Sequence, residues 1–287
     1  MQSLINQLDF DPANPFDINQ DPFCNFKPHS FKHSFAIDLY RHHWEWVWEG
    51  ELRTSLVYAE IAKNIRAGLY QTYLDDLSAQ DIDIFCNYFE QSVAEEMVHH
   101  YDIQSLLEKI YGAESIAALD TKENKDRIKK EIINDVVSAD LVSILIEYYV
   151  GECYHWCVFY NFYNQTTNAI KKDILHKFMT EEAEHHNNIY QLIKKIVNKI
   201  NTPAEQIIGM TRLRKYFGFD YVTTRHNVND VELLPRDQVW LALFCNNTWQ
   251  RNFNDQVLKK IYRMYDLLHP GITLDQFKDM INHNTAN

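Results

Sequence analysis

A scarcity of helix-breaking residues constrains the fold of this chain more than any other feature. The 287 residues include only seven glycines and seven prolines. A chain so poor in breakers favours long helices over strands joined by tight turns. Apolar residues also recur at helical intervals, as in the run Leu52, Leu56, Ile61, Ile65 and Leu69. The sequence therefore predicts an all-α protein.

Four long helices are expected in the central part of the chain, at about 35–74, 79–111, 128–164 and 170–200. Ser78 followed by Asp81 has the pattern of a helix N-cap, and Gly112 is placed to end the second helix. Residues 113–126 are polar enough for a connection or a short helix. Two antiparallel hairpins joined by one longer crossover form a four-helix bundle.

The segments on either side of this bundle have a different character. Residues 1–34 contain four prolines and are expected to form an extended N-terminal arm. Residues 35–200 would hold the bundle. Residues 201–287 are expected to form a helical C-terminal extension packed on it, with helices starting at Pro203 and Pro235 and a last one capped by Thr273.

Composition excludes several classes of function. The formal net charge of −12 argues against nucleic acid as a partner, because phosphate binding needs clustered Lys and Arg. No window approaches the ~18 apolar residues of a membrane span, and the N-terminus lacks the pattern of a signal peptide. We therefore expect a cytoplasmic protein with no membrane partner. Its five scattered cysteines are expected to be free thiols.

Two Glu-x-x-His motifs carry the chemistry. Glu96 and His99 lie in AEEMVHHYDI (94–103), and Glu182 and His185 lie in the similar segment TEEAEHHNNI (180–189). On a helix the i,i+3 spacing places both side chains on one face, where they can reach the same metal ion. A single such motif is weak evidence, since a third one (152–155) also occurs. Two motifs at corresponding places of two hairpins indicate a shared site.

Both motif glutamates share a helix face with apolar residues. An unpaired carboxylate there would be very costly, so each needs a cation, a proton or a metal ion. A two-metal bundle site also takes one carboxylate from each of the other two helices. On the first helix we choose Glu60, which lies on a stripe with Leu56 and Val57 and 36 residues before Glu96. Glu45, Glu49 and Glu51, nearer the start of that helix, are interpreted as solvated or partner-facing acids.

The third helix offers two candidates, Glu147 and Glu152. The stripe of Glu152 is almost purely apolar, whereas that of Glu147 includes Asp140 and Ser143, so Glu152 is preferred and Glu147 is the alternative. His100, His155 and His186 are interpreted as outer or surface residues, with His155 able to approach the site. The predicted metal ligands are Glu60, Glu96, His99, Glu152, Glu182 and His185.

Four carboxylates and two neutral imidazoles balance two divalent cations, and this oxygen-rich set suits iron or manganese better than structural zinc. The pattern resembles the ferritin-like di-iron carboxylate oxygenase superfamily over residues 40–200. The run Val150-Gly151-Glu152-Cys153 is similar to a ligand-bearing segment of bacterial multicomponent monooxygenase hydroxylases. Chain size and the helical extension are most similar to the arylamine (p-aminobenzoate) N-oxygenase group. That group has an additional histidine where this chain has Phe178.

This resemblance implies a ferritin-like four-helix bundle with extra C-terminal helices, holding two Fe ions or an iron–manganese pair. It implies an oxygenase that uses O2 to hydroxylate, N-oxygenate or desaturate a small organic molecule. No Gly-rich nucleotide loop is present, so an external electron donor is expected. Two alternatives stay open, a ferritin-like protein that oxidises iron and a metal-free helical interaction module. The substrate and the oligomeric state also stay open, a homodimer being one alternative.

Overall fold

The computed structural model describes residues 33–138, 140–165, 169–200, 247–268 and 270–284. Over these residues the secondary structure is helical and includes no strand, which confirms the all-α prediction for this part of the chain. Residues 1–32 of the expected N-terminal arm and residues 201–246 of the expected extension lie outside the described residues.

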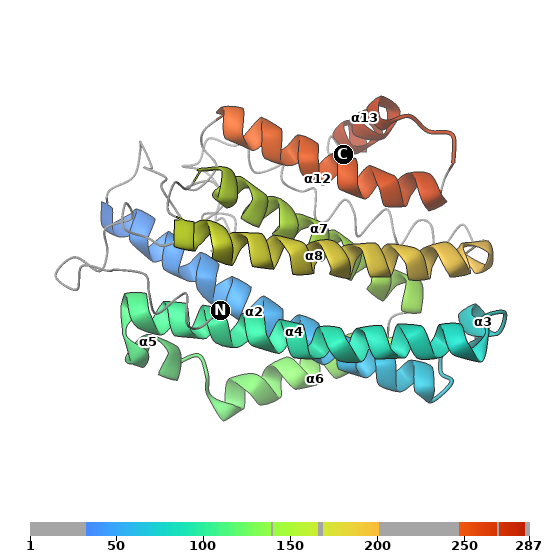
Figure 1. Cartoon of the computed structure of the whole chain (residues 1–287), viewed down its shortest axis with the longest axis horizontal. Helices are drawn as coiled ribbons and strands as arrows, with labels where there is room; N and C mark the ends of the chain where they lie inside the picture. Colours follow the sequence, from blue (N-terminus) through green and yellow to red (C-terminus); the bar gives the residue numbers. More distant parts are fainter. Residues whose placement is uncertain (1–32, 139, 166–168, 201–246, 269, 285–287) are drawn as a thin grey trace.

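Four long helices make up the centre of the molecule (Figure 1). They are α2 (His33–Arg66), α4 (Ala79–Tyr111), α7 (Leu141–Gln165) and α8 (Ala169–Ile196). Helix α2 packs along α4 and α7 packs along α8, each pair antiparallel, and α4 also contacts α8. Large apolar side chains from all four helices, including Trp48, Phe89, Tyr149 and Phe178, are buried between them.

Helix α4 begins and ends at the predicted residues, whereas α2 ends earlier than predicted. Helix α4 starts after Ser78, whose Oγ accepts a hydrogen bond of 3.1 Å from the backbone N–H of Asp81. It ends before Gly112, whose φ of +87° is a conformation that glycine adopts without strain. Helix α2 stops at Arg66, earlier than predicted, because Gly68 has a φ of +74°, and a short helix α3 (Gln71–Leu74) follows.

The predicted third helix is two helices, which corrects the single span of 128–164. Helix α6 (Lys122–Ser138) ends before α7 starts at Leu141, and a short helix α5 (Ala113–Ala117) precedes it. The carboxylate of Asp140 accepts a hydrogen bond of 2.9 Å from the backbone N–H of Ser143 and so caps a new helix. Helix α6 packs on α2, and only α7 pairs with α8.

The described part of the C-terminal segment is helical, as predicted. Helix α12 (Asn247–Leu268) packs on α7 and is followed by α13 (Leu274–Asn284). Thr273 caps α13 by accepting a hydrogen bond of 3.2 Å from the backbone N–H of Gln276. Helix α12 is held to α7 by the hydroxyl of Tyr149, which donates a 2.8 Å hydrogen bond to the carbonyl of Lys260. The ammonium of Lys260 also lies 3.9 Å from the ring centre of Trp156.

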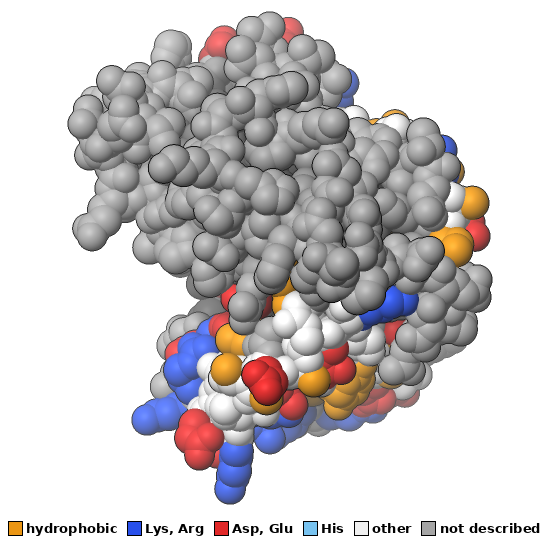
Figure 2. All heavy atoms as spheres, turned by 90° about the vertical axis from the view of Figure 1, so that its left-hand side faces the viewer, with side chains coloured by type: hydrophobic (Ala, Val, Ile, Leu, Met, Phe, Trp, Pro, Cys, Tyr) orange, Lys and Arg blue, Asp and Glu red, His pale blue; other side chains and the backbone are white. Residues whose placement is uncertain are grey.

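None of the described helices combines the length and the apolar character needed to cross a lipid bilayer. On the face drawn in Figure 2, the visible described side chains are interspersed acids and bases with smaller hydrophobic areas, and no histidine is visible among them.

Candidate metal centre

Six buried side chains capable of binding metal lie together between the four long helices. None of their residues is more than 3% exposed. Glu51 comes from α2, Glu152 from α7, and the two Glu-x-x-His motifs come from α4 and α8. The six residues are Glu51, Glu96, His99, Glu152, Glu182 and His185.

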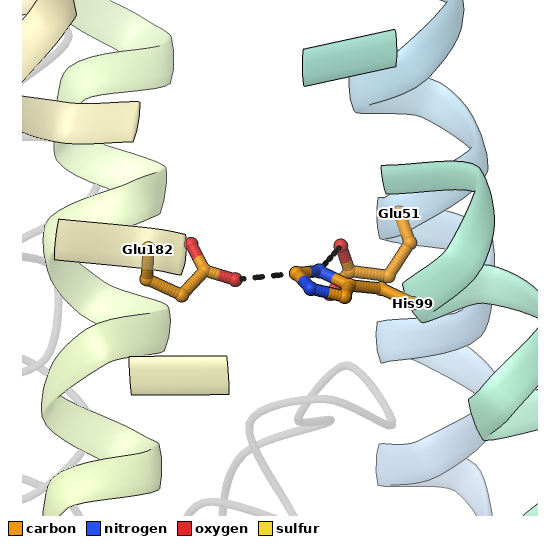
Figure 3. Close-up of side chains that lie close together, drawn as sticks. All are labelled: Glu51, His99 and Glu182. Carbon is orange, nitrogen blue, oxygen red and sulfur yellow. Dashed lines mark ion pairs between the residues drawn. The ribbon is translucent and has the colours of Figure 1, made fainter. Parts of the chain in front are cut away.

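The first group of donors, which we call position A, consists of Glu51, His99 and Glu182 (Figure 3). The three side chains point toward one another from α2, α4 and α8. The Nδ1 atom of His99 lies 3.6 Å from a carboxylate oxygen of Glu51 and 4.0 Å from one of Glu182. One donor atom from each of the three residues lies within 4.8 Å of the others, a spacing that a single ion can span.

The second group, position B, consists of Glu96, Glu152 and His185. The Nδ1 atom of His185 lies 2.8 Å from Glu96 Oε1 and 3.7 Å from Glu152 Oε2. Glu96 also lies next to position A, because its Oε2 is 3.7 Å from His99 Nδ1. The two positions are therefore adjacent, and each offers two carboxylates and one imidazole.

Most donor atoms that face the cluster make no hydrogen bond to a described residue, although His185 Nδ1 lies at ion-pair distance from Glu96 Oε1. These buried atoms are both carboxylate oxygens of Glu51, Glu96 and Glu182, and the Nδ1 atoms of His99 and His185. A protein interior leaves few polar atoms in this state, because each costs about 1–3 kcal/mol. A concentration of such atoms on inward-facing carboxylates and imidazoles has the chemistry of a cation site.

The outer nitrogen of each motif histidine is held by a carboxylate from the opposite motif helix. His99 Nε2 lies 2.7 Å from Glu181, and His185 Nε2 lies 3.0 Å from Glu95. A ring N–H at Nε2 donates to the carboxylate and leaves the Nδ1 lone pair available to a metal ion. These two acids were not predicted from the sequence. The signal was the Glu-Glu doublet that opens both motifs.

The cluster also shifts the proton affinities of its members. Burial alone disfavours a charged imidazole, but the carboxylates around His99 and His185 outweigh it and raise the pKa of both well above the usual value. Burial raises the pKa of Glu51 to about 7, and burial with the charge of Glu152 raises that of Glu182 well above the ordinary range. In the absence of metal the cluster therefore retains protons that divalent cations would displace.

The metal-free protein is expected to lose stability as the pH rises from about 7 to about 8, above the range in which His100 and His186, whose pKa values burial lowers, act in the opposite direction. The raised pKa of His99 and His185 contributes stability that is complete below their unfolded-state pKa and is lost at higher pH. Ionisation of Glu51 through its pKa of about 7 acts in the same direction. Urea denaturation at several pH values in the presence of a chelator measures this trend. A flat or rising free energy of unfolding across that interval would contradict it.

The surroundings of the two positions differ. Beside position B, the hydroxyl of buried Tyr58 donates a hydrogen bond to Glu152 Oε1. The hydroxyl of Tyr88 donates a 3.1 Å hydrogen bond to the backbone carbonyl of His185. Beside position A, the ring of His99 meets Phe178 edge-on at 4.8 Å, and Phe178 stacks on a further phenylalanine. Tyrosine hydroxyl groups thus hold residues of position B by hydrogen bonds, whereas apolar aromatic rings lie next to position A.

Five of the six predicted ligands lie in the cluster, and Glu60 does not. The carboxylate of Glu60 lies 2.7 Å from Lys63 Nζ and is 18% exposed. Glu51, interpreted from the sequence as a solvated acid, takes its place and is 1% exposed. The two glutamates are nine residues apart, which at 3.6 residues per turn puts them on opposite faces of α2. Of the two candidates on the third helix, Glu152 lies in the cluster, and Glu147 belongs to neither position.

The chain matches no known protein-family model, and no curated protein or solved structure is significantly similar to it. What the cluster can do must therefore be judged from its own donors. Four carboxylates and two imidazoles, arranged as two adjacent groups, can hold two divalent cations with balanced charge. The buried aromatic surroundings keep bulk water away from the donor atoms.

Proposed function

We propose that the protein is a non-haem di-iron oxygenase and that α2, α4, α7 and α8 form a ferritin-like four-helix bundle around the metal pair. The observation that supports this most strongly is the set of four carboxylates and two imidazoles that are buried together in two adjacent groups. Such bundles take a glutamate from each of two helices and a Glu-x-x-His motif from each of the other two. Glu51 and Glu152 are the single glutamates here, and α4 and α8 bear the motifs.

Iron or manganese fits this donor set better than other metals. Each position has one nitrogen donor and is otherwise made of carboxylate oxygens, whereas structural zinc sites use mainly sulfur and nitrogen. The charge of the four carboxylates equals that of two divalent ions, so the filled site is neutral. A reduced iron pair would supply the electrons that activate O2.

The residues around the donors have roles that follow from their contacts. Glu95 and Glu181 orient the two imidazoles by accepting from their outer nitrogens. Tyr58 holds one oxygen of Glu152, so the other oxygen faces position B. Phe178 and Phe159 form an apolar wall next to His99, which suits a nonpolar organic group. We therefore propose a small organic substrate and a separate electron donor.

A metal-free interaction module explains the cluster less well. In such a module the buried acids would be paired with lysine or arginine. Instead, the ion pairs of Glu51, Glu96 and Glu182 among the described residues are with histidines. The imidazoles alone do not balance these acids, because only His185 Nδ1 lies as close as 2.8 Å to one of them, whereas His99 Nδ1 lies 3.6–4.0 Å from its carboxylate neighbours.

Oxygen consumption by the iron-loaded protein tests the proposed function. Protein reconstituted with Fe(II), given a reductant and a panel of small organic substrates, is expected to consume O2 at least about tenfold faster than the metal-free protein. An oxygen electrode measures the rate, and mass spectrometry identifies a product carrying oxygen or lacking hydrogen. Equal rates for the two forms would remove the basis of the oxygenase assignment. Stoichiometric O2 use with Fe(II) alone and no product would point to iron oxidation.

A further inference from the structure

A third histidine lies against the same carboxylates. His155 is on α7, one turn after Glu152, at the i,i+3 spacing of the two ligand motifs. One of its ring nitrogens, a Glu152 oxygen and a Glu182 oxygen lie within 4.8 Å of one another. Its Nδ1 atom also lies 3.9 Å from Glu51 Oε1, and its side chain is only 14% exposed. The ring therefore approaches the cluster from the α7 side.

The first hairpin has no equivalent of this histidine. Glu51 on α2 and Glu152 on α7 are the candidate ligands from the first helix of each hairpin. Three residues after Glu51 stands Thr54, not a histidine. Two of the three acids near His155, Glu51 and Glu182, belong to position A. We propose that His155 is a third imidazole ligand, bound to the ion at position A, and that the two metal positions consequently differ in affinity. This inference rests on the proposed metal pair.

Coordination chemistry favours this assignment. A neutral imidazole adds a donor without adding charge, so the balance between four carboxylates and two divalent ions is unchanged. Position A then has the nitrogens of His99 and His155, whereas position B has only that of His185. For iron, each added imidazole strengthens binding relative to water. Position A is therefore the tighter position and fills first.

Anaerobic titration of the metal-free full-length protein with Fe(II) tests the assignment. Calorimetry of the wild type is expected to show two binding events of unequal affinity. In His155→Gln the tighter event weakens about 10- to 100-fold, the scale on which metal sites respond to lost support, and the weaker event persists. His176→Gln, which changes an exposed histidine on α8, is the matched control and leaves both events unchanged.

A second variant separates ligation from packing. His155→Ala leaves a space the size of the ring, and free imidazole is expected to restore the tighter event in that variant. Titration with Co(II) adds a spectroscopic reading, because the visible absorption of the first ion bound changes when a nitrogen ligand is lost. Wild-type affinities and an unchanged Co(II) spectrum in His155→Gln would overturn the assignment while leaving the metal pair intact. A wild-type protein that binds neither Fe(II) nor Co(II) would overturn both.

Discussion

Removal of the metal ions is expected to lower the melting temperature of the protein by about 10 °C or more. Without ions, the buried carboxylates of Glu51, Glu96 and Glu182 face one another and the motif imidazoles, so the cluster must take up protons or remain uncompensated. An ion present at a hundred times its dissociation constant stabilises the folded state by about 2.7 kcal/mol, and the proposed site has positions for two ions. A change of 1 kcal/mol moves the melting temperature of a domain this large by about 2–4 °C.

Thermal unfolding followed by circular dichroism measures this effect. The metal-loaded protein is compared with the same sample after exhaustive chelation and after Fe(II) or Mn(II) is added back. Recovery of the melting temperature on re-addition shows that the loss was not damage. Calcium, which prefers more oxygen ligands in a larger site, is the control ion and should restore little. An identical melting temperature in all samples would mean that the cluster is stable without a metal.

Glu182→Gln is expected to have opposite effects on stability and on activity. Glu182 is 0% exposed, its carboxylate oxygens have no partner, and burial together with Glu152 raises its pKa well above the usual value. Glutamine has nearly the same shape without the charge. It should stabilise the metal-free protein at pH 8 by about 1–3 kcal/mol, because glutamine needs neither the proton that the buried carboxyl retains nor a compensating cation. The same change should lower metal-dependent O2 consumption by about 100-fold or more.

Urea denaturation in a chelator and an oxygen electrode measure the two effects on one variant. Glu60→Gln is the matched control. Glu60 also lies on one of the four long helices, α2, but it is paired with Lys63 and partly exposed. Its stability should change by less than about 1 kcal/mol, with activity retained. If Glu182→Gln instead destabilised the metal-free protein by about 3–5 kcal/mol, the glutamate would be a structural ion-pair partner.

The two motifs were predictable because their information is local. A glutamate and a histidine three residues apart on one helix share a face whatever surrounds them, and the apolar neighbours showed which face was buried. Leu175, Phe178 and Ile189, which lie on the stripe of Glu182, are all buried. The same reasoning selected Glu152, whose stripe on α7 is largely apolar. Where a side chain belongs to a strongly patterned helix, the sequence is enough to predict that it faces the interior.

The candidate ligand on α2, Glu51, was not predictable by the same test, because two faces of that helix contain apolar residues. Glu60 lies beside Leu56 and Val57, but a more continuous stripe is formed by Trp48, Glu51, Ser55, Tyr58 and Ala62, each at most 2% exposed. The two acids differ in their distance from the connection between α2 and α4. Glu51 and Glu96 lie about equally far in sequence from the connection between α2 and α4, as residues at one level of an antiparallel pair must. Glu60 lies too near that connection.

The break between α6 and α7 escaped the sequence analysis for a different reason. Neither glycine nor proline marks it, so the stretch 128–164 reads as one continuous helix. The signal is the cap itself, in which the Asp140 carboxylate accepts from the backbone N–H of Ser143. Aspartate is also common within helices, and its capping role becomes visible only when the backbone turns there. This break lets α6 cover α2 while α7 presents Glu152 to the interior.

The metal content of the purified protein tests the central claim most directly. Protein from iron-supplemented culture is analysed by mass spectrometry alongside Glu96→Ala, Glu182→Ala, Glu51→Ala and Glu60→Ala, each checked for folding by circular dichroism. The account predicts about two iron or manganese ions per chain in the wild type and in Glu60→Ala, with loss in the other three variants. A folded wild-type protein without metal after reconstitution, or full metal content in Glu96→Ala and Glu182→Ala, would contradict it.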